Sequence, residues 1–351
     1  MASKVVGLDI GTSGVRAAEL TLGKGATLER FGQVALPPGA VRDGQVVDSG
    51  AVAHALRQLW AQAKFSTKKV VLGVANQNVV VRQVDLPWLP EDELRKSLPF
   101  QVQDFVPMPV EDAILDFHSL EEFTNDQGGR MQRVLLVAAS RDMVGGVLDG
   151  VKQAGLDPQV VDLTSFAVIR ALATEHGFGS PDAEALVDIG ASVTNIVVHQ
   201  GGVPRFVRIL MMGGGDITDA VAERLGVPHE QAESVKQQTG LAANAGLAEA
   251  HPAQRAIEAA GSRLVDEIRG SLDYFVAQMG APRLTRLIVA GGGSLLPGIV
   301  DRLSSATRLP VQPARPLSVL KIGKTGLTPE QLAYVEPMVT VPVGLAMGVA
   351  S

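Results

Sequence analysis

Cysteine is absent from this chain of 351 residues. Without thiols, disulfides, zinc–thiolate sites, iron–sulfur clusters and cysteine nucleophiles are all excluded. The six histidines are scattered and never form an HExxH spacing, which excludes a zinc protease of that class. Aromatic residues make up only 4%, so the core must be built from aliphatic side chains. With 46% hydrophobic and 19% charged residues the composition is globular, and the length favours two domains or more.

An excess of positive charge and a long apolar run are also missing. The formal net charge of -6 argues against nucleic-acid binding, which needs a basic surface. The longest apolar stretches, such as 341–350, are shorter than the ~20 residues that cross a bilayer. The N-terminus enters a strand pattern directly, without the apolar core of a signal peptide. We therefore expect a cytoplasmic protein, which could still dock on a membrane protein.

Short apolar runs alternate with amphipathic segments along most of the chain, which predicts an α/β fold with largely parallel sheets. Strands are expected at 5–10, 15–20, 186–189, 193–199 and 287–290, and helices at 49–64, 141–154, 163–176, 216–225 and 254–279. Segment 71–155 has a different pattern: strands at 71–74, 79–85, 113–120 and 133–139 surround one helix at 90–105. A loop at 125–129 joins the last two strands as a hairpin. This segment therefore predicts a small α+β insert, and the Pro-rich stretch 310–331 is predicted as loop.

Two strand–turn–strand segments, far apart in the chain, carry the same local sequence. VGLDIGTS (6–13) and LVDIGAS (186–192) each end a strand with Asp-Ile-Gly and a small polar residue. Glycine lets the backbone approach a ligand, and successive N–H groups of such a turn can bind phosphate oxygens. The aspartate can hold water on a divalent cation that neutralises the phosphates. One such turn is explained equally well as a structural hairpin, but the pair favours a phosphate site and two halves with related folds.

A third glycine-rich turn lies in IVAGGGSLLPG (288–298), where a strand leads to a helix start near Pro297. Adjacent glycines leave room for a base or an α-phosphate, and a helix N-terminus favours negative charge. A plain strand-to-helix turn explains the same residues. The tripeptide Gly323-Lys324-Thr325 only imitates a P-loop, because Ser318 stands where that motif needs glycine. No GxGxxG follows a strand, which argues against a dinucleotide-binding Rossmann site.

The chain carries, in order, the first Asp-Ile-Gly turn, a helix at 162–173, the second Asp-Ile-Gly turn, the triple glycine at 291–293 and a last helix at 344–349. This order resembles the actin-like ATPase superfamily, which includes actin, the sugar kinases, FtsA and MreB. More closely, VVGLDIGTSGVRAAEL, LPFQVQDFVPMPVEDAILDF and LVDIGASVTNIVV resemble the PilM family, the FtsA-like proteins of type IV pilus assembly. The resemblance implies an α/β, actin-like ATPase fold, with two ribonuclease-H-like lobes around a nucleotide cleft and an FtsA-type α+β insert subdomain.

The resemblance also implies a division into four subdomains. The first lobe would comprise 1–70 and 157–183, the insert 71–156, the second lobe 184–213 and 286–351, and a small helical or mixed subdomain 214–285. Helices at 162–173 and 344–349 would connect the two lobes.

A site for ATP and Mg²⁺ follows from the same resemblance. Asp9 and Asp188 would hold Mg²⁺ through water. Asp162 would orient the attacking water, although a helix N-cap role fits this residue equally well. Glu233 and Lys236, three apart on one helix, would contact the ribose and base, or would form a solvated ion pair. The other residues implied at the nucleotide are Gly11, Thr12, Ser13, Arg16, Gly190, Ala191, Ser192, Thr194, Gly214, Gly291, Gly292, Gly293 and Ser294.

The function implied by the resemblance is a nucleotide-binding scaffold of the type IV pilus inner-membrane assembly complex. Its partner would be the N-terminal cytoplasmic tail of a PilN-like inner-membrane protein, bound as an extended peptide in a groove between the first lobe and the insert. A PilO-like protein and the pilus motor would be reached indirectly, a homo-oligomer stays open, and no nucleic acid is expected. Asp162 is the sole candidate in the sequence for positioning a water, so we expect firm ATP binding with slow or partner-dependent hydrolysis.

Three other functions stay open. A filament-forming ATPase like FtsA or MreB would need complementary end surfaces, which the sequence does not reveal. A sugar or acetate kinase would need a second substrate pocket, and segment 71–155 takes the place of its substrate loops. The third alternative is a structural protein with an inactive site.

Overall fold

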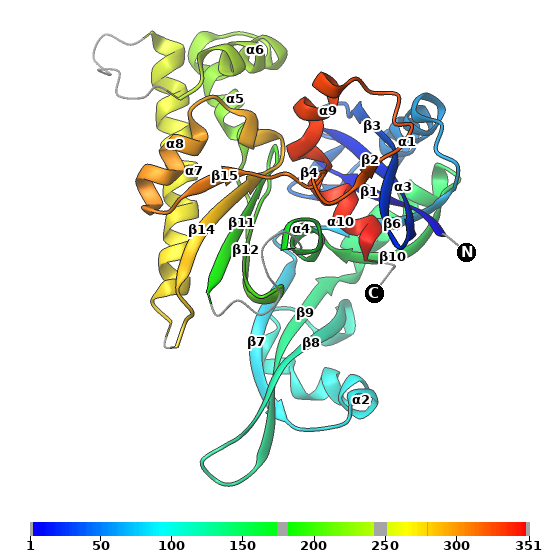
Figure 1. Cartoon of the computed structure of the whole chain (residues 1–351), viewed down its shortest axis with the longest axis vertical. Helices are drawn as coiled ribbons and strands as arrows, with labels where there is room; N and C mark the ends of the chain where they lie inside the picture. Colours follow the sequence, from blue (N-terminus) through cyan, green and yellow to red (C-terminus); the bar gives the residue numbers. More distant parts are fainter. Residues whose placement is uncertain (1–2, 174–181, 242–250, 279, 349–351) are drawn as a thin grey trace.

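The computed structural model describes residues 3–173, 182–241, 251–278 and 280–348. Two large sheets lie side by side with helices around them, and a smaller sheet extends away from the pair (Figure 1). The predicted mixture of strands and helices, with both parallel and antiparallel pairing, is confirmed. Among the described residues, no helix combines the length and the apolar character needed to cross a membrane.

The first sheet has the strand order β10-β6-β1-β2-β3-β16. Its strands are β1 (Ser3–Ile10), β2 (Gly14–Gly23), β3 (Gly25–Ala35), β6 (Lys69–Val74), β10 (Asp157–Leu163) and β16 (Lys321–Ile322). β1, β2 and β3 pair antiparallel, and β6 and β10 extend the sheet in parallel on the other side of β1. Helices α1 (Ser49–Ala63) and α3 (Arg141–Gln153) cover one face through an aliphatic core that includes Val6, Leu8 and Leu56.

The second sheet repeats this plan. Its order is β13-β12-β11-β14-β15, with an antiparallel run of three strands followed by two parallel strands. The strands are β11 (Ala183–Ile189), β12 (Thr194–Gln200), β13 (Val203–Leu210), β14 (Leu284–Ala290) and β15 (Val311–Pro313). One face packs against a group of helices, α5 (Gly214–Leu225), α6 (His229–Thr239), α7 (Pro252–Val276) and α8 (Ile299–Thr307). Because both sheets share one strand order, the two Asp-Ile-Gly turns occupy equivalent positions, each after the first strand of its sheet.

Two helices, α4 (Thr164–Leu172) and α10 (Thr340–Met347), lie between the sheets and form a core common to both (Figure 1). This core joins residues such as Leu20 of the first sheet and Leu186 of the second. The backbones approach closely at two glycines: a Cβ on Gly344 would lie 1.8 Å from the Ala167 carbonyl oxygen, and one on Gly7 would lie 1.9 Å from that of Pro342. No larger residue fits at these crossings without moving the backbone.

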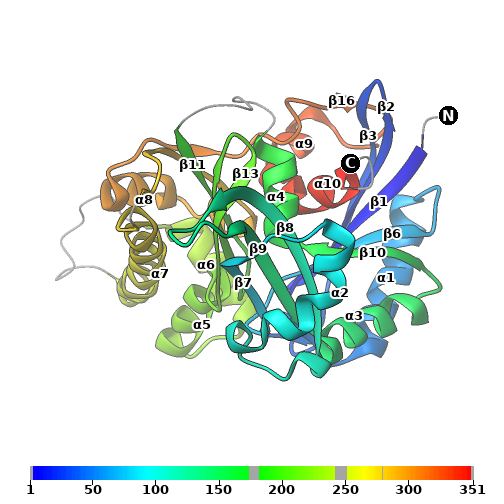
Figure 2. The same ribbon diagram turned by 90° about the horizontal axis from the view of Figure 1, so that it is seen from below.

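The insert forms a sheet of its own, with the order β7-β9-β8. Its elements are β7 (Val79–Pro87), α2 (Glu91–Gln101), β8 (Ala113–Thr124) and β9 (Arg130–Ser140), with 3-10 turns at Gln103–Phe105 and Val110–Asp112. The predicted helix at 90–105 thus ends as a short 3-10 turn, and the predicted hairpin at 125–129 joins β8 to β9. The insert reaches the second sheet as well (Figure 2), because the Gln83 side-chain amide donates to the Arg205 carbonyl at 2.6 Å.

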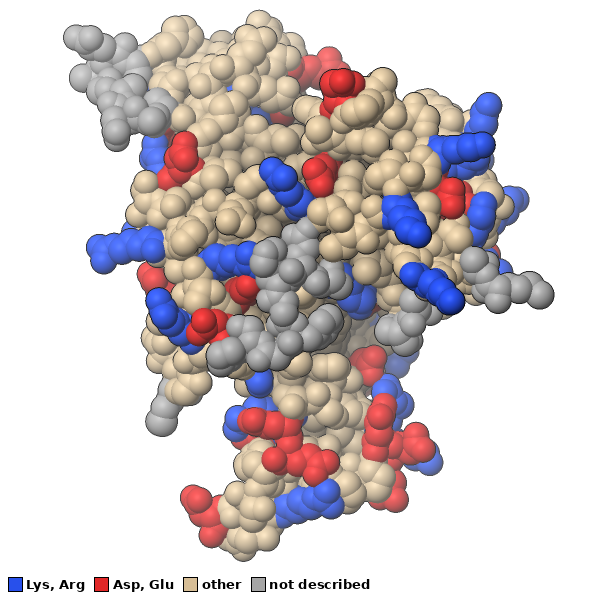
Figure 3. All heavy atoms as spheres, viewed as in Figure 1, with Lys and Arg blue, Asp and Glu red and all other residues tan. Residues whose placement is uncertain are grey.

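Acidic and basic side chains alternate on the surface of the insert, at the lower end of the molecule in Figure 3. Arg133 lies between Asp85 and Glu121, with N–O distances of 2.7 Å and 2.6 Å. The Arg130 guanidinium stacks on the Trp88 ring at 3.7 Å, and the indole N–H donates to Glu122. These paired charges fix exposed side chains on the protruding hairpin, although exposed ion pairs contribute only about 0–1 kcal/mol each.

The end of the described chain returns to the first sheet. The resemblance implies that 286–351 belong to the second lobe, but β16 pairs with β3 and α10 packs on β1 and β2. The reason is that α10 is apolar on every side, so its sequence indicates burial without indicating which sheet buries it. The stretch predicted as loop at 310–331 contains β15, β16 and the start of α9 (Pro329–Val335), and a 3-10 turn (Glu336–Val339) leads into α10. Residues 349–351 of the expected lobe lie outside the described residues.

We predict that Gly344→Ala destabilises the protein by about 1–3 kcal/mol or more, because its Cβ would overlap the backbone of α4 at Ala167. Urea unfolding followed by circular dichroism measures this change. Gly270→Ala on α7 is the matched control, since a Cβ there meets nothing within 4 Å. We expect it to stabilise the protein by roughly 0.5–1 kcal/mol through helix propensity. Equal stability of the two variants would contradict the close crossing of α4 and α10.

Candidate functional site

The two Asp-Ile-Gly turns have the same hydrogen bonds. The Gly11 N–H donates to the Gly14 carbonyl at 3.0 Å, and the Gly190 N–H donates to the Val193 carbonyl at 2.9 Å. The aspartates also occupy equivalent registers, because Asp9 lies opposite Arg16 in the first hairpin and Asp188 lies opposite Asn195 in the second. The local sequence therefore sets both turns, while the cross-strand partner of each carboxylate differs.

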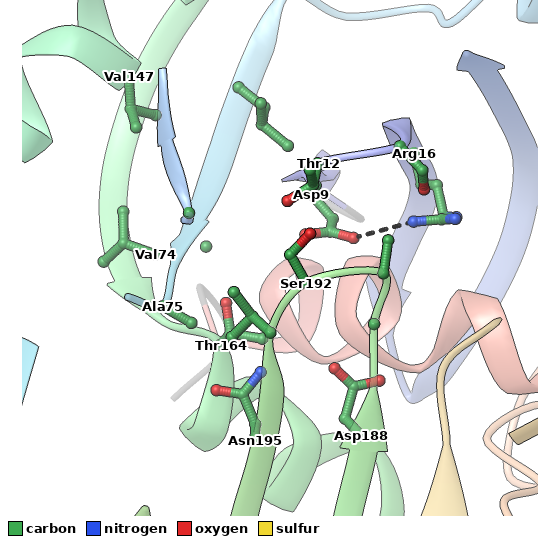
Figure 4. Close-up of a pocket in the computed structure, with 18 of the residues that line it drawn as sticks. Asp9, Thr12, Arg16, Val74, Ala75, Val147, Thr164, Asp188, Ser192 and Asn195 are labelled. Carbon is green, nitrogen blue, oxygen red and sulfur yellow. Dashed lines mark ion pairs between the residues drawn. The ribbon is translucent and has the colours of Figure 1, made fainter. Parts of the chain in front are cut away.

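Both turns line one pocket (Figure 4). The first hairpin contributes Asp9, Ile10, Gly11, Thr12, Ser13 and Arg16, and the second contributes Asp188, Gly190, Ala191, Ser192, Val193 and Asn195. The rest of the lining comes from the first-sheet side, with Gly44, Val46, Gly73, Val74, Ala75, Val147 and Thr164. Two turns that are far apart in the sequence thus line a single pocket, as the resemblance implies.

The two carboxylates in this pocket repel each other. Burial raises the pKa of Asp188 to about 7, and the neighbouring charge of Asp9 adds to this rise, whereas Arg16 and a hydrogen bond from Asn195 lower it. Burial also raises the pKa of Asp9, with Arg16 acting in the opposite direction. The Arg16 Nη1 lies 3.7 Å from Asp9 Oδ2. Asp188 therefore has the weaker compensation, and a cation placed between the turns would relieve both carboxylates.

The groups around these carboxylates fit a cation bound together with phosphate. Carboxylate oxygens are the ligands that Mg²⁺ prefers, usually with several of its waters retained. Thr12, Ser13 and Ser192 add hydroxyls, and the turns add backbone N–H groups. The Arg16 Nε is buried and has no hydrogen-bond partner, which leaves one donor at the pocket wall for an anion. The residues present thus suit a magnesium–phosphate group.

The triple glycine at 291–293 packs against the second turn. A Cβ on Gly291 would lie 2.4 Å from the Ile189 carbonyl oxygen, and its φ of +80° also favours glycine. A Cβ on Gly293 would lie 2.3 Å from Ile189 Cγ2, whereas one on Gly292 would meet only Met338 at 3.9 Å. Two of these glycines are therefore required by packing, and Gly292 leaves bare backbone beside the second turn. Ser294 bonds back to the Gly291 carbonyl at 2.7 Å.

Helix α5 begins directly on the second turn. The N–H groups of Gly214 and Gly215 donate to the Gly190 and Ala191 carbonyls at 2.9 Å and 2.7 Å. The Lys236 ammonium of α6 then donates to the Gly214 carbonyl, at 3.1 Å, and also to Thr218 and Glu233. α6 is thereby tied to the turn through the first residues of α5.

The interpretation of Glu233 and Lys236 as a solvated ion pair is wrong, because Lys236 is only 8% exposed. Burial of Glu233 by itself would raise its pKa, but hydrogen bonds from Lys236 and Thr218 lower that pKa overall. Neither residue is among those that line the pocket of the two aspartates, and their contact with a ribose or base stays a prediction.

Two other residues expected at the nucleotide have different surroundings. The Asp162 carboxylate pairs with Arg170 and accepts from the Leu163 N–H, and Asp162 does not line the pocket. The N-cap of α4 is Leu163, so the N-cap alternative for Asp162 is wrong, and the ion pair does not favour a water-orienting role. Thr194 is fully buried and donates to the Met212 carbonyl at 2.7 Å. Its hydroxyl holds β12 to the segment that leads into α5 and does not line the pocket.

Several residues of the pocket wall were not predicted from the sequence, and three of them, Gly73, Thr164 and Asn195, lie beside the aspartates or next to α4. A Cβ on Gly73 would lie 2.9 Å from the Thr164 hydroxyl, so these two define the wall next to α4. Asn195 could have been identified, since it is a polar residue next to the apolar run 196–198, shortly after the second turn. Gly73 and Thr164 could not, because only the tertiary fold brings β6 and α4 to the turns.

The sheets, connecting helices and paired turns are those of an actin-like ATPase fold. MreB5 of Spiroplasma citri bound to AMPPNP has this fold, with a TM-score of 0.54 at 13% identity, over 100% of this chain and 99% of that one. The sequence profile of "Type IV pilus assembly protein PilM" matches residues 7–349. The chain belongs to this family.

The chain is also similar to individual proteins of known structure or sequence. The chain is 28% identical to a chain in the structure "PilM-PilN type IV pilus biogenesis complex", with a TM-score of 0.88 and 100% coverage of both chains. It is 27% identical to the cell division protein FtsA of Bacillus subtilis, over 68% of this chain and 58% of that protein. It therefore spans less than two thirds of the length of this FtsA. For FtsA of Neisseria meningitidis the identity is 26%, over 88% of this chain and 83% of that protein.

We predict that Asp188→Asn removes a pH-dependent loss of stability. The folded-state pKa of Asp188 is about 7 and the ordinary value is 3.8, so the folded chain holds the proton more tightly. The stability from this group is fully present below pH 4 and is lost as the pH rises through 7. Between pH 5 and pH 8 the unmutated protein should lose about 2–3 kcal/mol more than the variant.

Urea unfolding at both pH values, without nucleotide or Mg²⁺, measures this difference. Asp126→Asn at the exposed tip of the insert is the control, because it removes one negative charge without any burial. If Asp188→Asn loses as much stability as the unmutated protein between pH 5 and pH 8, the raised pKa of Asp188 is refuted.

Proposed function

We propose that this chain binds ATP with Mg²⁺ between its two Asp-Ile-Gly turns and binds the N-terminal cytoplasmic tail of a PilN-like membrane protein. Nucleotide state would thereby be linked to assembly of the type IV pilus. The observation that carries the nucleotide site is the convergence of both turns, with Asp9 and Asp188, on one pocket.

The chemistry of the pocket supports this nucleotide. Mg²⁺ supplies positive charge that neutralises the phosphates and lowers the cost of the two buried carboxylates. Asp9 and Asp188 would hold it through water, while Thr12, Ser13 and Ser192 donate to phosphate oxygens. Arg16 lies in the same pocket beside Asp9, where its guanidinium can pair with either the carboxylate or a phosphate.

Slow hydrolysis is the expected consequence of this donor set. Among the described residues that line the pocket, Asp9 and Asp188 are the carboxylates, and both are assigned to the cation. Asp162 is held by Arg170. Phosphoryl transfer depends on a positioned water, so a pocket without a spare carboxylate favours binding over turnover.

The likeness to a PilM–PilN complex supports the proposed partner. The first sheet offers a place for an extended peptide, because β10 is its outermost strand on one side. The insert leaves this sheet after β6 and returns through α3 to β10, so β10 borders the insert. Val160 of β10 is 44% exposed. An extended tail could pair with this open strand and cover Val160. Such a partner would place the chain at the cytoplasmic face of the inner membrane.

We predict that Asp9→Ala and Asp188→Ala each weaken Mg·ATP binding by about 10–100-fold, since each removes a carboxylate that holds the cation. Isothermal titration calorimetry with ATP and excess Mg²⁺ provides the affinity. Asp162→Asn is the matched control, because this carboxylate lies outside the pocket and pairs with Arg170. It should bind within about twofold of the unmutated protein. Full affinity in both alanine variants would disprove the site.

We predict that a peptide of the cytoplasmic tail of the cognate PilN-like protein binds this chain. Val160→Glu should weaken this binding by about tenfold or more, because it places a charge on the proposed docking strand β10. Ile322→Glu is the matched control: Ile322 is also 44% exposed, and it lies on β16 at the opposite edge of the same sheet. Fluorescence anisotropy of the labelled peptide, with and without Mg·ATP, compares the three proteins. Equal binding by both variants would move the peptide site away from β10.

A further inference from the structure

Asn195 is buried at the floor of the pocket and faces the second aspartate. It lies on β12 directly opposite Asp188 on β11, and only 3% of it is exposed. Figure 4 shows the two side chains next to each other, with Thr164 of α4 on the other side of Asn195. In the first hairpin the equivalent position holds Arg16, opposite Asp9. The second carboxylate thus has an amide where the first has a cation.

The hydrogen bonds of Asn195 fix its orientation. Its side-chain amide donates to the Asp188 carboxylate. Its Oδ1 accepts from the Ser165 hydroxyl at 3.2 Å. A carboxylate only accepts when ionised, and an amide has donors on one atom and lone pairs on the other. Both contacts therefore require the same orientation of the amide, with the NH₂ group toward Asp188.

Ser165 brings the connecting helix into this arrangement. It lies in the first turn of α4, is 1% exposed, and belongs to the helix that packs between the two sheets. The path Ser165–Asn195–Asp188 thus runs from the connecting helix, through the second sheet, to the pocket. Because all three side chains are buried, each can change its hydrogen bonds only if another moves.

We propose that Asn195 is a positioning residue that orients the Asp188 carboxylate toward Mg²⁺ and that Ser165 of α4 fixes Asn195 in the required orientation. This inference rests on the proposed function and goes beyond it, because it makes cation binding depend on the contact between α4 and the second sheet. Groups that orient a metal-binding side chain commonly affect metal affinity by 10–100-fold. In this proposal Asn195 acts on the cation through Asp188.

The test separates cation binding from nucleotide binding. ATP affinity is measured by calorimetry twice for each protein, once with excess Mg²⁺ and once with EDTA. Asn195→Leu, close in size but without polar atoms, should lose about 10–100-fold in the presence of Mg²⁺ and less than about twofold in EDTA. A purely structural role would reduce both affinities alike, and that result would overturn the proposal.

If Asn195→Leu does not fold, Ser165→Ala replaces it in the test. This substitution removes only a buried hydroxyl group, so it changes the packing very little. It should lose roughly 2–10-fold with Mg²⁺ and nothing in EDTA. Thr285→Val is the matched control, since the Thr285 hydroxyl donates to the Ala183 carbonyl at the far end of the same sheet. It should leave both affinities unchanged.

Failure of this inference is distinct from failure of the proposed function. If the unmutated protein prefers Mg·ATP and both variants keep that preference, Asn195 and Ser165 do not position Asp188, and the nucleotide site stands. If the unmutated protein binds ATP under neither condition, the nucleotide site fails and the positioning role fails with it.

Discussion

Two carboxylates that repel each other, the half-buried Asp9 and the buried Asp188, meet in the pocket. Asp9 and Asp188 end equivalent strands of two different sheets, and the fold brings them to one pocket. Burying like charges is costly unless a counter-charge is present. Arg16 pairs with Asp9 and also lowers the pKa of Asp188, but burial and the charge of Asp9 still raise that pKa to about 7. The structure thus keeps an unfavourable electrostatic arrangement that a divalent cation would relieve, which is the usual sign of a binding site rather than of a structural hairpin.

The packing around α4 and α10 explains how this arrangement is maintained. α4 contacts strands of both sheets and α10 packs on the first sheet, and both helices belong to a core that the two sheets share. Gly344 brings the backbones of α4 and α10 together without a side chain between them. We expect this contact to resist sliding of the two helices past each other, because close-packed backbones and side chains have few alternative arrangements. The insert adds a further link, since Gln83 bonds to Arg205 of the second sheet. A change in the relative position of the two sheets would therefore also move the insert against one of them.

Local features could be predicted from the sequence, and features that depend on packing could not. The turns at Asp9 and Asp188 were predictable because their glycines and hydrogen bonds involve residues close in the chain. The ion pair of Asp162 with Arg170 was not, since it requires the first turns of α4 to bring the two together. Lys236 was weighed as a surface residue because spacing along a helix says nothing about what covers the helix. The resemblance implied the second lobe for 286–351, and the uniform apolarity of α10 could not correct this, because it indicates burial without indicating which sheet buries the helix.

The difference between the two hairpins suggests how a repeated fold acquires two roles. Both halves use the same strand order and the same turn, so neither feature distinguishes them. One distinction lies in the cross-strand position opposite each aspartate, which holds Arg16 in the first half and Asn195 in the second. An arginine opposite the carboxylate brings positive charge to that side of the pocket and suits contact with an anion. An amide brings no positive charge to the carboxylate opposite it, which suits a cation. A nucleotide with its metal carries both charges, so it would match the two halves together better than either half alone.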